Sequence, residues 1–180
     1  MLIFLIGPPG AGKSRLAPLL AQAFGTDAHD LDLAIAASAG TTVAAIFAAE
    51  GEAGFRRYER AALEAAIAGG VGVVATGGGI TQDQTCRELM RSAGQVVFLS
   101  ASPATQLRRI GADAERARRP LLVDAAGAAD LLARLQALHA ERLAGYRAAA
   151  HLEIATDAAT PEQLVAQLAA RLGPVAGDGR

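Results

Sequence analysis

Short apolar runs alternate along the chain with longer stretches in which apolar residues recur at helical spacing. The runs carry no charge except Glu153 in the last one, a pattern typical of strands buried on both faces. They predict strands at 2–6, 71–76, 95–100 and 151–155, with a short further strand just before Asp30. The helical patterns predict helices at 13–24, 33–38, 42–68, 84–92, 103–110, 128–149 and 161–172. Strand followed by helix, repeated, indicates an α/β fold with a parallel sheet covered by helices on both sides.

Glycines and charges interrupt this regular pattern. Gly51 or Gly54 is expected to break the long helix at 42–68. The segment 111–127 is polar, charged and bounded by glycines, so it predicts a mobile loop. The residues 173–180 are expected to fray at the end of a single domain that spans 1–180.

Composition and charge narrow the class of protein. The chain has 180 residues, 52% of them hydrophobic, which is enough for one domain with a substantial core. Its formal net charge of −1 comes from scattered residues, so we expect no basic face for nucleic acid and no polybasic stretch for a membrane. No apolar run approaches the roughly 18 residues of a membrane span. The single cysteine, Cys86, and the lack of signal-peptide features favour a soluble protein in a reducing, cytoplasmic setting.

The stretch GPPGAGKS at 7–14 follows the first apolar run and opens the first helical pattern. In this context, glycines let backbone N–H groups surround a phosphate, and the helix N-terminus adds its positive end. Lys13, the only lysine in the chain, suits the β- and γ-phosphates, and Ser14 can offer its hydroxyl to Mg²⁺. The alternative is a plain glycine-rich turn, which would not need the full spacing.

The segment HDLDL provides carboxylates for a nucleotide site. The buried run VGVVAT leads into Gly77 and the run VVFLS ends in Ser100, so neither supplies an acid for the metal. In an extended segment Asp30 and Asp32 would point the same way, so one could serve Mg²⁺ and the other could orient a substrate hydroxyl. Alternatively, Asp32 merely caps the following helix and Asp30 is a solvated turn residue.

Further patterns suggest a pocket beside the phosphate loop. In GEAGFRRYE, Arg56 lies four residues after Glu52 and three before Glu59, so flanking acids can hold it for a carboxylate or phosphate. In ATGGGI, three glycines after a buried strand indicate a close approach to the backbone. In ERLAGYR, Arg142 and Tyr146 share a helix face. Each pattern has a simpler alternative. The residues around Arg56 could form a solvated ion-pair face, the three glycines a plain turn, and Arg142 with Tyr146 a solvated helix face.

The loop at 111–127 carries its own arginines. Arg116, Arg118 and Arg119 precede PLL, and the proline fixes an arginine that could close over phosphates as part of a lid. A disordered charged loop is the alternative.

Taken in this order, the motifs resemble those of the shikimate kinase family. The matching segments are GPPGAGKS, DLD, IFAAEGEAGFRRYE, VVATGGGI, RRPLL and ERLAGYR, spread over about residues 2–172. The resemblance implies a three-layer α/β/α P-loop fold like that of nucleoside monophosphate kinases, with a five-stranded parallel sheet and a mobile lid. It also implies transfer of the γ-phosphoryl group of ATP to the 3-hydroxyl of shikimate in aromatic amino-acid biosynthesis, with Mg²⁺ as cofactor, by a monomer.

The resemblance implies a role for each matching residue. Lys13, Asp32 and Arg119 are implied to be catalytic, with Arg119 the lid arginine. ATP binding is implied for Gly10, Ala11, Gly12, Lys13, Ser14, Arg15, Arg109, Arg119 and Pro161. Shikimate binding is implied for Asp32, Arg56, Gly78, Gly79 and Arg142, with substrate-binding elements at about 32–62. Ser14 and Asp30 are implied to serve Mg²⁺, Asp30 through water.

The chain departs from the family pattern in places. Ala36 stands where many relatives carry glutamate, Arg15 stands where threonine is frequent, and the lid between Arg109 and Arg119 is slightly longer than usual. Two alternatives remain: another small-molecule P-loop kinase, of the gluconate or nucleoside monophosphate type, and a regulatory module that binds ATP without turnover. The first would not need the triple glycine with two arginines, and the second would not need Asp32 and Arg119.

Overall fold

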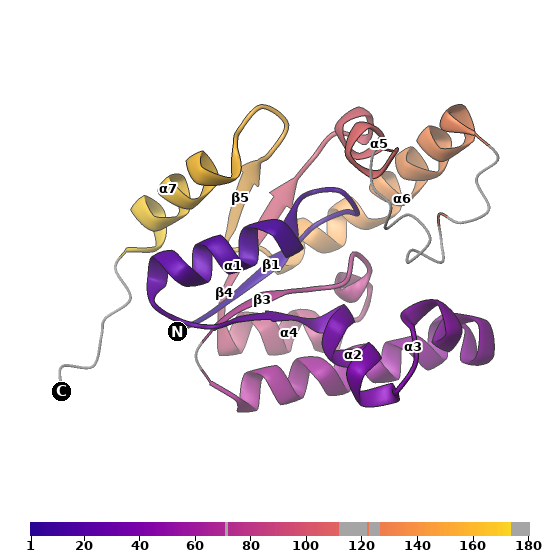
Figure 1. Cartoon of the computed structure of the whole chain (residues 1–180), viewed down its shortest axis with the longest axis horizontal. Coiled ribbons are helices and arrows are strands. Elements are labelled where there is room, and N and C mark those ends of the chain that lie inside the picture. The colour runs from indigo at the N-terminus through magenta and orange to yellow at the C-terminus, as the bar shows by residue number, and fades with distance from the viewer. Residues whose placement is uncertain (71, 112–121, 123–126, 174–180) are drawn as a thin grey trace.

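Five parallel strands form one sheet in the order β2-β3-β1-β4-β5 in the computed structural model, which describes residues 1–70, 72–111, 122 and 127–173 (Figure 1). The strands are β1 (Leu2–Ile6), β2 (Ala28–Asp30), β3 (Gly72–Ala75), β4 (Gly94–Ser100) and β5 (Leu152–Ala155). Every neighbouring pair is parallel; in β1, Leu2 lies opposite Gly72 of β3 and Gly94 of β4. The predicted five-stranded parallel sheet is therefore confirmed.

Helices cover both faces of the sheet. They are α1 (Lys13–Phe24), α2 (Leu31–Ala39), α3 (Val43–Ala68), α4 (Gln84–Ala93), α5 (Pro103–Gly111), α6 (Ala128–Ala149) and α7 (Pro161–Leu172), with a short 3₁₀ helix η1 (Ile80–Gln82). Alternate residues of β1 enter different cores: Ile3 and Leu5 pack with α1 and α7, whereas Phe4 packs with α3, α4 and α6. This two-sided burial explains why the β1 sequence is apolar throughout.

The helix boundaries follow local signals. Within α3, Gly51 has φ 68° and ψ −173°, so the predicted break occurs at Gly51 and not at Gly54. The short helix η1 after the triple glycine was not predicted. α2 begins at Leu31, two residues before the predicted start, because the Asp30 side chain caps it by accepting from the backbone N–H groups of Asp32 and Leu33.

Part of the predicted lid lies outside the described residues, including Arg116, Arg118 and Arg119. Leu122 is described, and its side chain is buried against Ile110 of α5 and Leu131 and Leu135 of α6. Most of the predicted tail, 174–180, also lies outside the described residues. Among the described helices, none alone is long and apolar enough to cross a membrane; α2 and α3 meet those criteria only as a pair bent by 94°.

Candidate active site

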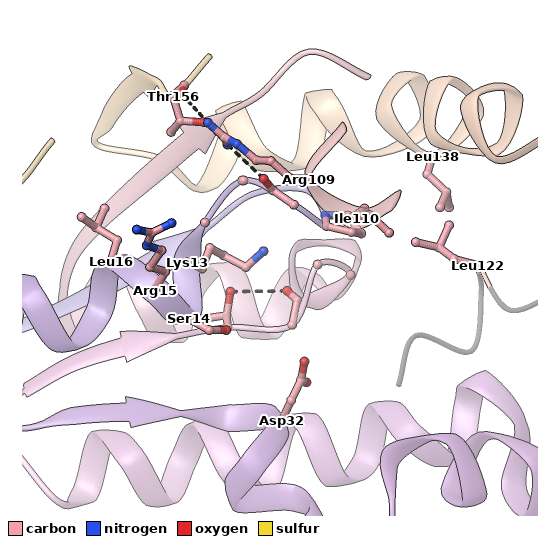
Figure 2. Close-up of a pocket in the computed structure, with 18 of the residues that line it drawn as sticks. Lys13, Ser14, Arg15, Leu16, Asp32, Arg109, Ile110, Leu122, Leu138 and Thr156 are labelled. Carbon is pink, nitrogen blue, oxygen red and sulfur yellow. Dashed lines mark hydrogen bonds between the residues drawn. The ribbon is translucent and has the colours of Figure 1, made fainter. Parts of the chain in front are cut away.

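A cavity of about 860 Å³ lies at the carboxyl ends of the strands, where ligands bind in open parallel sheets. Each strand is followed by a lining segment (Figure 2). The lining residues used below are Pro9, Gly10, Lys13, Ser14, Arg15, Asp32, Val43, Phe47, Phe55, Arg56, Glu59, Gly77, Gly78, Gly79, Arg109, Arg142, Thr156 and Pro161. The segments predicted to bind phosphate and acceptor therefore share one cavity.

Residues 7–12 join β1 to the N-terminus of α1 and form the phosphate loop. Gly12 precedes the helix with φ 96°, a conformation that glycine adopts without steric cost. The first N–H groups of α1 have no partner within the helix and are suited to an anion. The Lys13 ammonium donates to the carbonyls of Gly7 at 2.7 Å and Pro8 at 3.0 Å, so its charge lies at the loop.

Arg109 of α5 ties this loop to the far edge of the sheet. Its guanidinium donates to the Gly10 carbonyl at 3.0 Å and to both the hydroxyl and the carbonyl of Thr156, at 3.0 and 2.5 Å (Figure 2). Thr156 directly follows β5, and Pro161 opens α7 nearby in the same cavity lining. Arg109 thus fixes the loop relative to the segment expected to face the nucleotide base.

The structure corrects the predicted geometry of the two aspartates. Asp30 and Asp32 do not lie in one extended segment, because Asp30 is the N-cap of α2 and Asp32 lies in its first turn. The alternative explanation was also wrong in detail, since the capping side chain is Asp30 and not Asp32. Asp32 lines the cavity and points from α2 toward the phosphate-loop side, whereas Asp30 is not in the lining (Figure 2).

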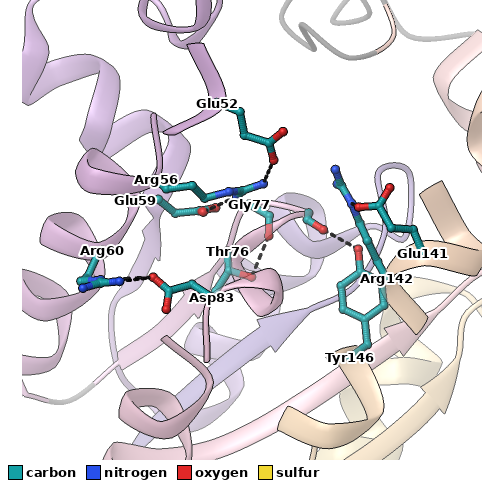
Figure 3. A network of polar contacts seen from close by, with 11 residues as sticks. Glu52, Arg56, Glu59, Arg60, Thr76, Gly77, Asp83, Glu141, Arg142 and Tyr146 are labelled. Atoms are coloured by element: carbon teal, nitrogen blue, oxygen red, sulfur yellow. Dashed lines mark hydrogen bonds and ion pairs between the residues drawn. The ribbon is translucent and has the colours of Figure 1, made fainter. Parts of the chain in front are cut away.

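Arg56 is held on α3 by two carboxylates, as the sequence predicted. Its guanidinium nitrogens lie 2.5 Å from Glu52 and 2.5 Å from Glu59 (Figure 3). Although burial lowers it, the pKa of Arg56 is raised overall by Glu59 and Glu52. The side chain is part-buried at 18% exposure and lines the cavity, so it is not an ordinary solvated ion pair.

Glu59 is a charged residue in an unusual environment. Its side chain is 1% exposed, and its Oε1 has no hydrogen-bond partner among the described residues. Burial raises the pKa of Glu59 to about 6, although Arg56 lowers it, while Asp32 adds to the rise. Glu59 therefore lines the cavity as well as pairing with Arg56.

The triple glycine is explained by what lies against each residue. A Cβ on Gly77 would lie 2.5 Å from the Glu59 Oε1. A Cβ on Gly78 would lie 3.2 Å from Pro9 of the phosphate loop, and one on Gly79 would lie 2.3 Å from the Arg56 guanidinium. The predicted close approach to this backbone is confirmed, and the approaching groups are site side chains.

Arg142 and Tyr146 of α6 are buried, which rules out a solvated face. Arg142 is 4% exposed and lines the cavity; among the described residues its Nε has no hydrogen-bond partner and lies 3.8 Å from the Glu141 carboxylate. The Tyr146 hydroxyl donates to the Gly78 carbonyl (Figure 3). The structure therefore brings Arg56, Arg142 and the glycine loop to one cavity.

Two features of the site were missed from the sequence. Glu59 was predicted only as a partner of Arg56 on one helix face; its burial and its place in the cavity lining were not predicted. The apolar wall of the cavity formed by Val43, Phe47 and Phe55 was not predicted; the two phenylalanine rings lie 4.5 Å apart. Phe55 precedes Arg56 directly, which was the available signal.

Comparisons with known proteins agree with this geometry. A family model described as shikimate kinase matches residues 9–173. The chain is 42% identical over 172 residues to a shikimate kinase of Symbiobacterium thermophilum, covering 96% of each chain, and 42% identical over 178 residues to one of Thermobifida fusca, covering 98% and 97%. Among solved structures, the Acinetobacter baumannii shikimate kinase in complex with shikimate has a TM-score of 0.86 at 33% identity, covering 95% of this chain and 92% of that one. The Bacteroides thetaiotaomicron shikimate kinase has a TM-score of 0.86 at 29% identity, covering 96% and 98%.

Proposed function

The chain belongs to the shikimate kinase family and is an ATP-dependent kinase, and we propose that its cavity transfers the γ-phosphoryl group of ATP to the 3-hydroxyl of shikimate, giving shikimate 3-phosphate and ADP. One observation carries the proposal: the same cavity holds a phosphate loop and two buried or part-buried arginines, Arg56 and Arg142. A small acid with hydroxyl groups matches both features.

On the acceptor side, Arg56 and Arg142 bind the shikimate carboxylate. A guanidinium presents donors in a planar fork that matches a carboxylate. Glu52 and Glu59 already orient Arg56, so less entropy is lost when the acid binds. The Gly78 and Gly79 backbone closes the pocket, and Asp32 at the start of α2 orients the attacking hydroxyl.

On the nucleotide side, the loop residues Gly10 to Arg15 surround the phosphates. The Lys13 ammonium, now bonded to loop carbonyls, neutralises the β- and γ-phosphates when ATP binds. Arg109 and Pro161 flank the adenine end of the cavity. The lid role of Arg119 stays a prediction because this residue lies outside the described part of the chain.

Ser14 and Asp30 are the proposed magnesium residues. Both present hard oxygen atoms, and Asp30 already uses Oδ1 to cap α2, so it would act through water from its other oxygen. No group of three or more His, Cys, Asp or Glu that could hold a metal occurs among the described residues. A magnesium ion that arrives with ATP would keep several waters and offset charge on the β- and γ-phosphates, so it would need few protein oxygens.

These roles suit the reaction. Phosphoryl transfer asks little covalent chemistry of a protein, so its rate depends on aligning the hydroxyl with the phosphorus and on placing cations nearby. Asp32 performs the first task and Lys13 the second. The monomeric state and the cytoplasmic location stay predictions from the sequence.

The acceptor is tested by measuring Mg²⁺-dependent ADP release with shikimate, quinate, gluconate, AMP or CMP. Strong stimulation by shikimate alone is expected. Stimulation by another acceptor, or by none, would contradict the assignment of the pocket.

A pair of neighbouring arginines tests the clamp. Arg56→Ala should raise the shikimate KM at least tenfold and leave the ATP KM nearly unchanged, because the charge-assisted hydrogen bond to the shikimate carboxylate is lost. Arg57→Ala is the matched control, since Arg57 is 72% exposed and pairs with Glu50 outside the cavity. Equal changes in both KM values for Arg56→Ala would remove the clamp from the proposal.

A further inference from the structure

Tyr146 lies beneath the acceptor pocket, and the proposed reaction gives it no role. It belongs to α6, one helical turn after Arg142, and its side chain is fully buried. Its hydroxyl donates to the carbonyl of Gly78, the middle residue of the triple glycine (Figure 3). A tyrosine hydroxyl at such a depth needs a partner, and here the partner is the backbone of the pocket itself.

The tyrosine ring is fixed independently of its hydroxyl. It stacks on Phe98 of β4 with the ring centres 5.0 Å apart and an angle of 23° between planes. The adjacent Gly145 lets α6 approach η1 closely, since a Cβ there would lie 2.9 Å from the Thr81 carbonyl oxygen. Burial raises the pKa of Tyr146, so the hydroxyl stays protonated and remains a donor at any working pH.

The Gly78 peptide lies between the phosphate loop and the acceptor residues. Its α-carbon faces Pro9 of the phosphate loop, 3.2 Å from where a Cβ would stand. The preceding glycine faces Glu59 and Asp32, and the following one faces Arg56. Rotation of this peptide would therefore change the spacing between the acceptor residues and the phosphate loop.

We propose that Tyr146 is a positioning residue for the acceptor: its hydroxyl fixes the Gly78 peptide and so holds Arg142 on α6 in register with Arg56 on α3. The inference rests on the proposed function, because it concerns the pocket assigned to shikimate. Arg142 supports it, since its buried side chain lines the cavity and its Nε lies 3.8 Å from the Glu141 carboxylate on the same helix, so the position of Arg142 depends on where α6 lies.

The two tyrosines of the chain provide a matched test. Tyr146→Phe keeps the ring stacked on Phe98 and removes only the hydroxyl. Tyr58→Phe removes a hydroxyl bonded to Glu50 at 2.9 Å on the surface, away from the cavity. For wild type and both variants, kcat, the KM for shikimate, the KM for ATP and the urea midpoint are measured.

Tyr146→Phe is expected to raise the shikimate KM about fivefold, the effect of one lost hydrogen bond, and to change the ATP KM less than about twofold. Tyr58→Phe should change neither KM. Equal shifts of both KM values for Tyr146→Phe, or no shift, would overturn the inference. Wild-type protein without shikimate-dependent ADP release would instead overturn the proposed function, and this inference with it.

A third variant separates positioning from core stability. Phe98→Leu weakens the ring contact but keeps the hydroxyl and its carbonyl partner. It should lower the urea midpoint without a selective rise in the shikimate KM. If Phe98→Leu reproduces the KM change of Tyr146→Phe at equal stability loss, the effect belongs to core packing and Tyr146 is not a positioning residue.

Discussion

Glu59 shows how the surroundings of a single residue set its chemistry. Its carboxyl group faces Arg56, Asp32 and Arg142 in a buried position, and burial raises its pKa from 4.5 to about 6. The folded chain therefore binds a proton at Glu59 more tightly than the unfolded chain does. This residue contributes stability below about pH 4.5 that is lost as the pH rises through about 6.

Substitution of Glu59 by glutamine makes this contribution measurable. The difference in free energy of unfolding between wild type and Glu59→Gln should shift by about 2 kcal/mol between a pH well below 4.5 and a pH well above 6, with wild type losing stability relative to the variant. Urea denaturation of both proteins at several pH values measures it, and the titration of other groups cancels in the comparison. A difference that stays constant with pH would show that Glu59 titrates normally.

The residues around Arg56 differ in how far the sequence could predict their contacts. Arg56 could be predicted with its two acids because all three lie within two turns of one helix, where spacing fixes which side chains meet. The burial of Glu59 could not, since it depends on Gly77, which lies in a loop beyond the end of α3. The Asp30 cap was misassigned because a cap position depends on where the backbone turns, and local propensity does not fix that to one residue.

At the level of elements, helix α1, which follows the phosphate loop, contains a proline in its interior. Pro18 lies inside the helix and is exposed, yet α1 continues from Lys13 to Phe24. Proline has no N–H, so the carbonyl of Ser14 has no partner four residues later in the helix. The Pro18 side chain is exposed, so little packing offsets this loss.

Pro18→Ala should therefore stabilise the protein. The expected gain in free energy of unfolding is about 1–2 kcal/mol. It is less than the roughly 3 kcal/mol cost of an interior proline, because alanine also increases the conformational entropy of the unfolded chain. Urea denaturation with comparison of midpoints measures it. Pro161→Ala is the matched control, because Pro161 is at the first turn of α7, where proline is favoured, and it should give no gain. Equal effects of the two substitutions would contradict the lost-bond explanation.

Strands and long helices could be predicted because each carries its own signal over many residues. Strands β1, β3, β4 and β5 followed from apolar runs, and the kink at Gly51 followed from glycine; β2, with the sequence AHD, carries no apolar run. The short helix η1 has no such signal, since three residues after a glycine turn hold no period. Its position is set by α6, which packs closely on it at Gly145.

At the scale of the whole molecule, contacts between distant segments build the site. Arg109 reaches Gly10 across 99 positions of sequence, and Tyr146 reaches Gly78 across 68. Motif order could place these residues at one edge of the sheet but could not show which side chain meets which backbone group. The contacts divide the cavity into the end proposed for the nucleotide, beside Arg109, and the end proposed for the acceptor, between α3 and α6.

This division predicts that Arg109→Met changes the KM for ATP and leaves the KM for shikimate nearly unchanged. The substitution removes charged hydrogen bonds to Gly10 and Thr156, so the phosphate loop loses its tie to the segment after β5. The ATP KM should rise about tenfold, the effect of about 1.4 kcal/mol, while the shikimate KM changes less than about twofold. Steady-state kinetics with each substrate varied in turn measures both. Arg171→Met, at an exposed position late in α7, is the control and should alter neither KM. A comparable rise in the shikimate KM for Arg109→Met would contradict this division of the cavity. It would mean that a change in the phosphate loop also shifts the acceptor residues, through the contact between Pro9 and Gly78.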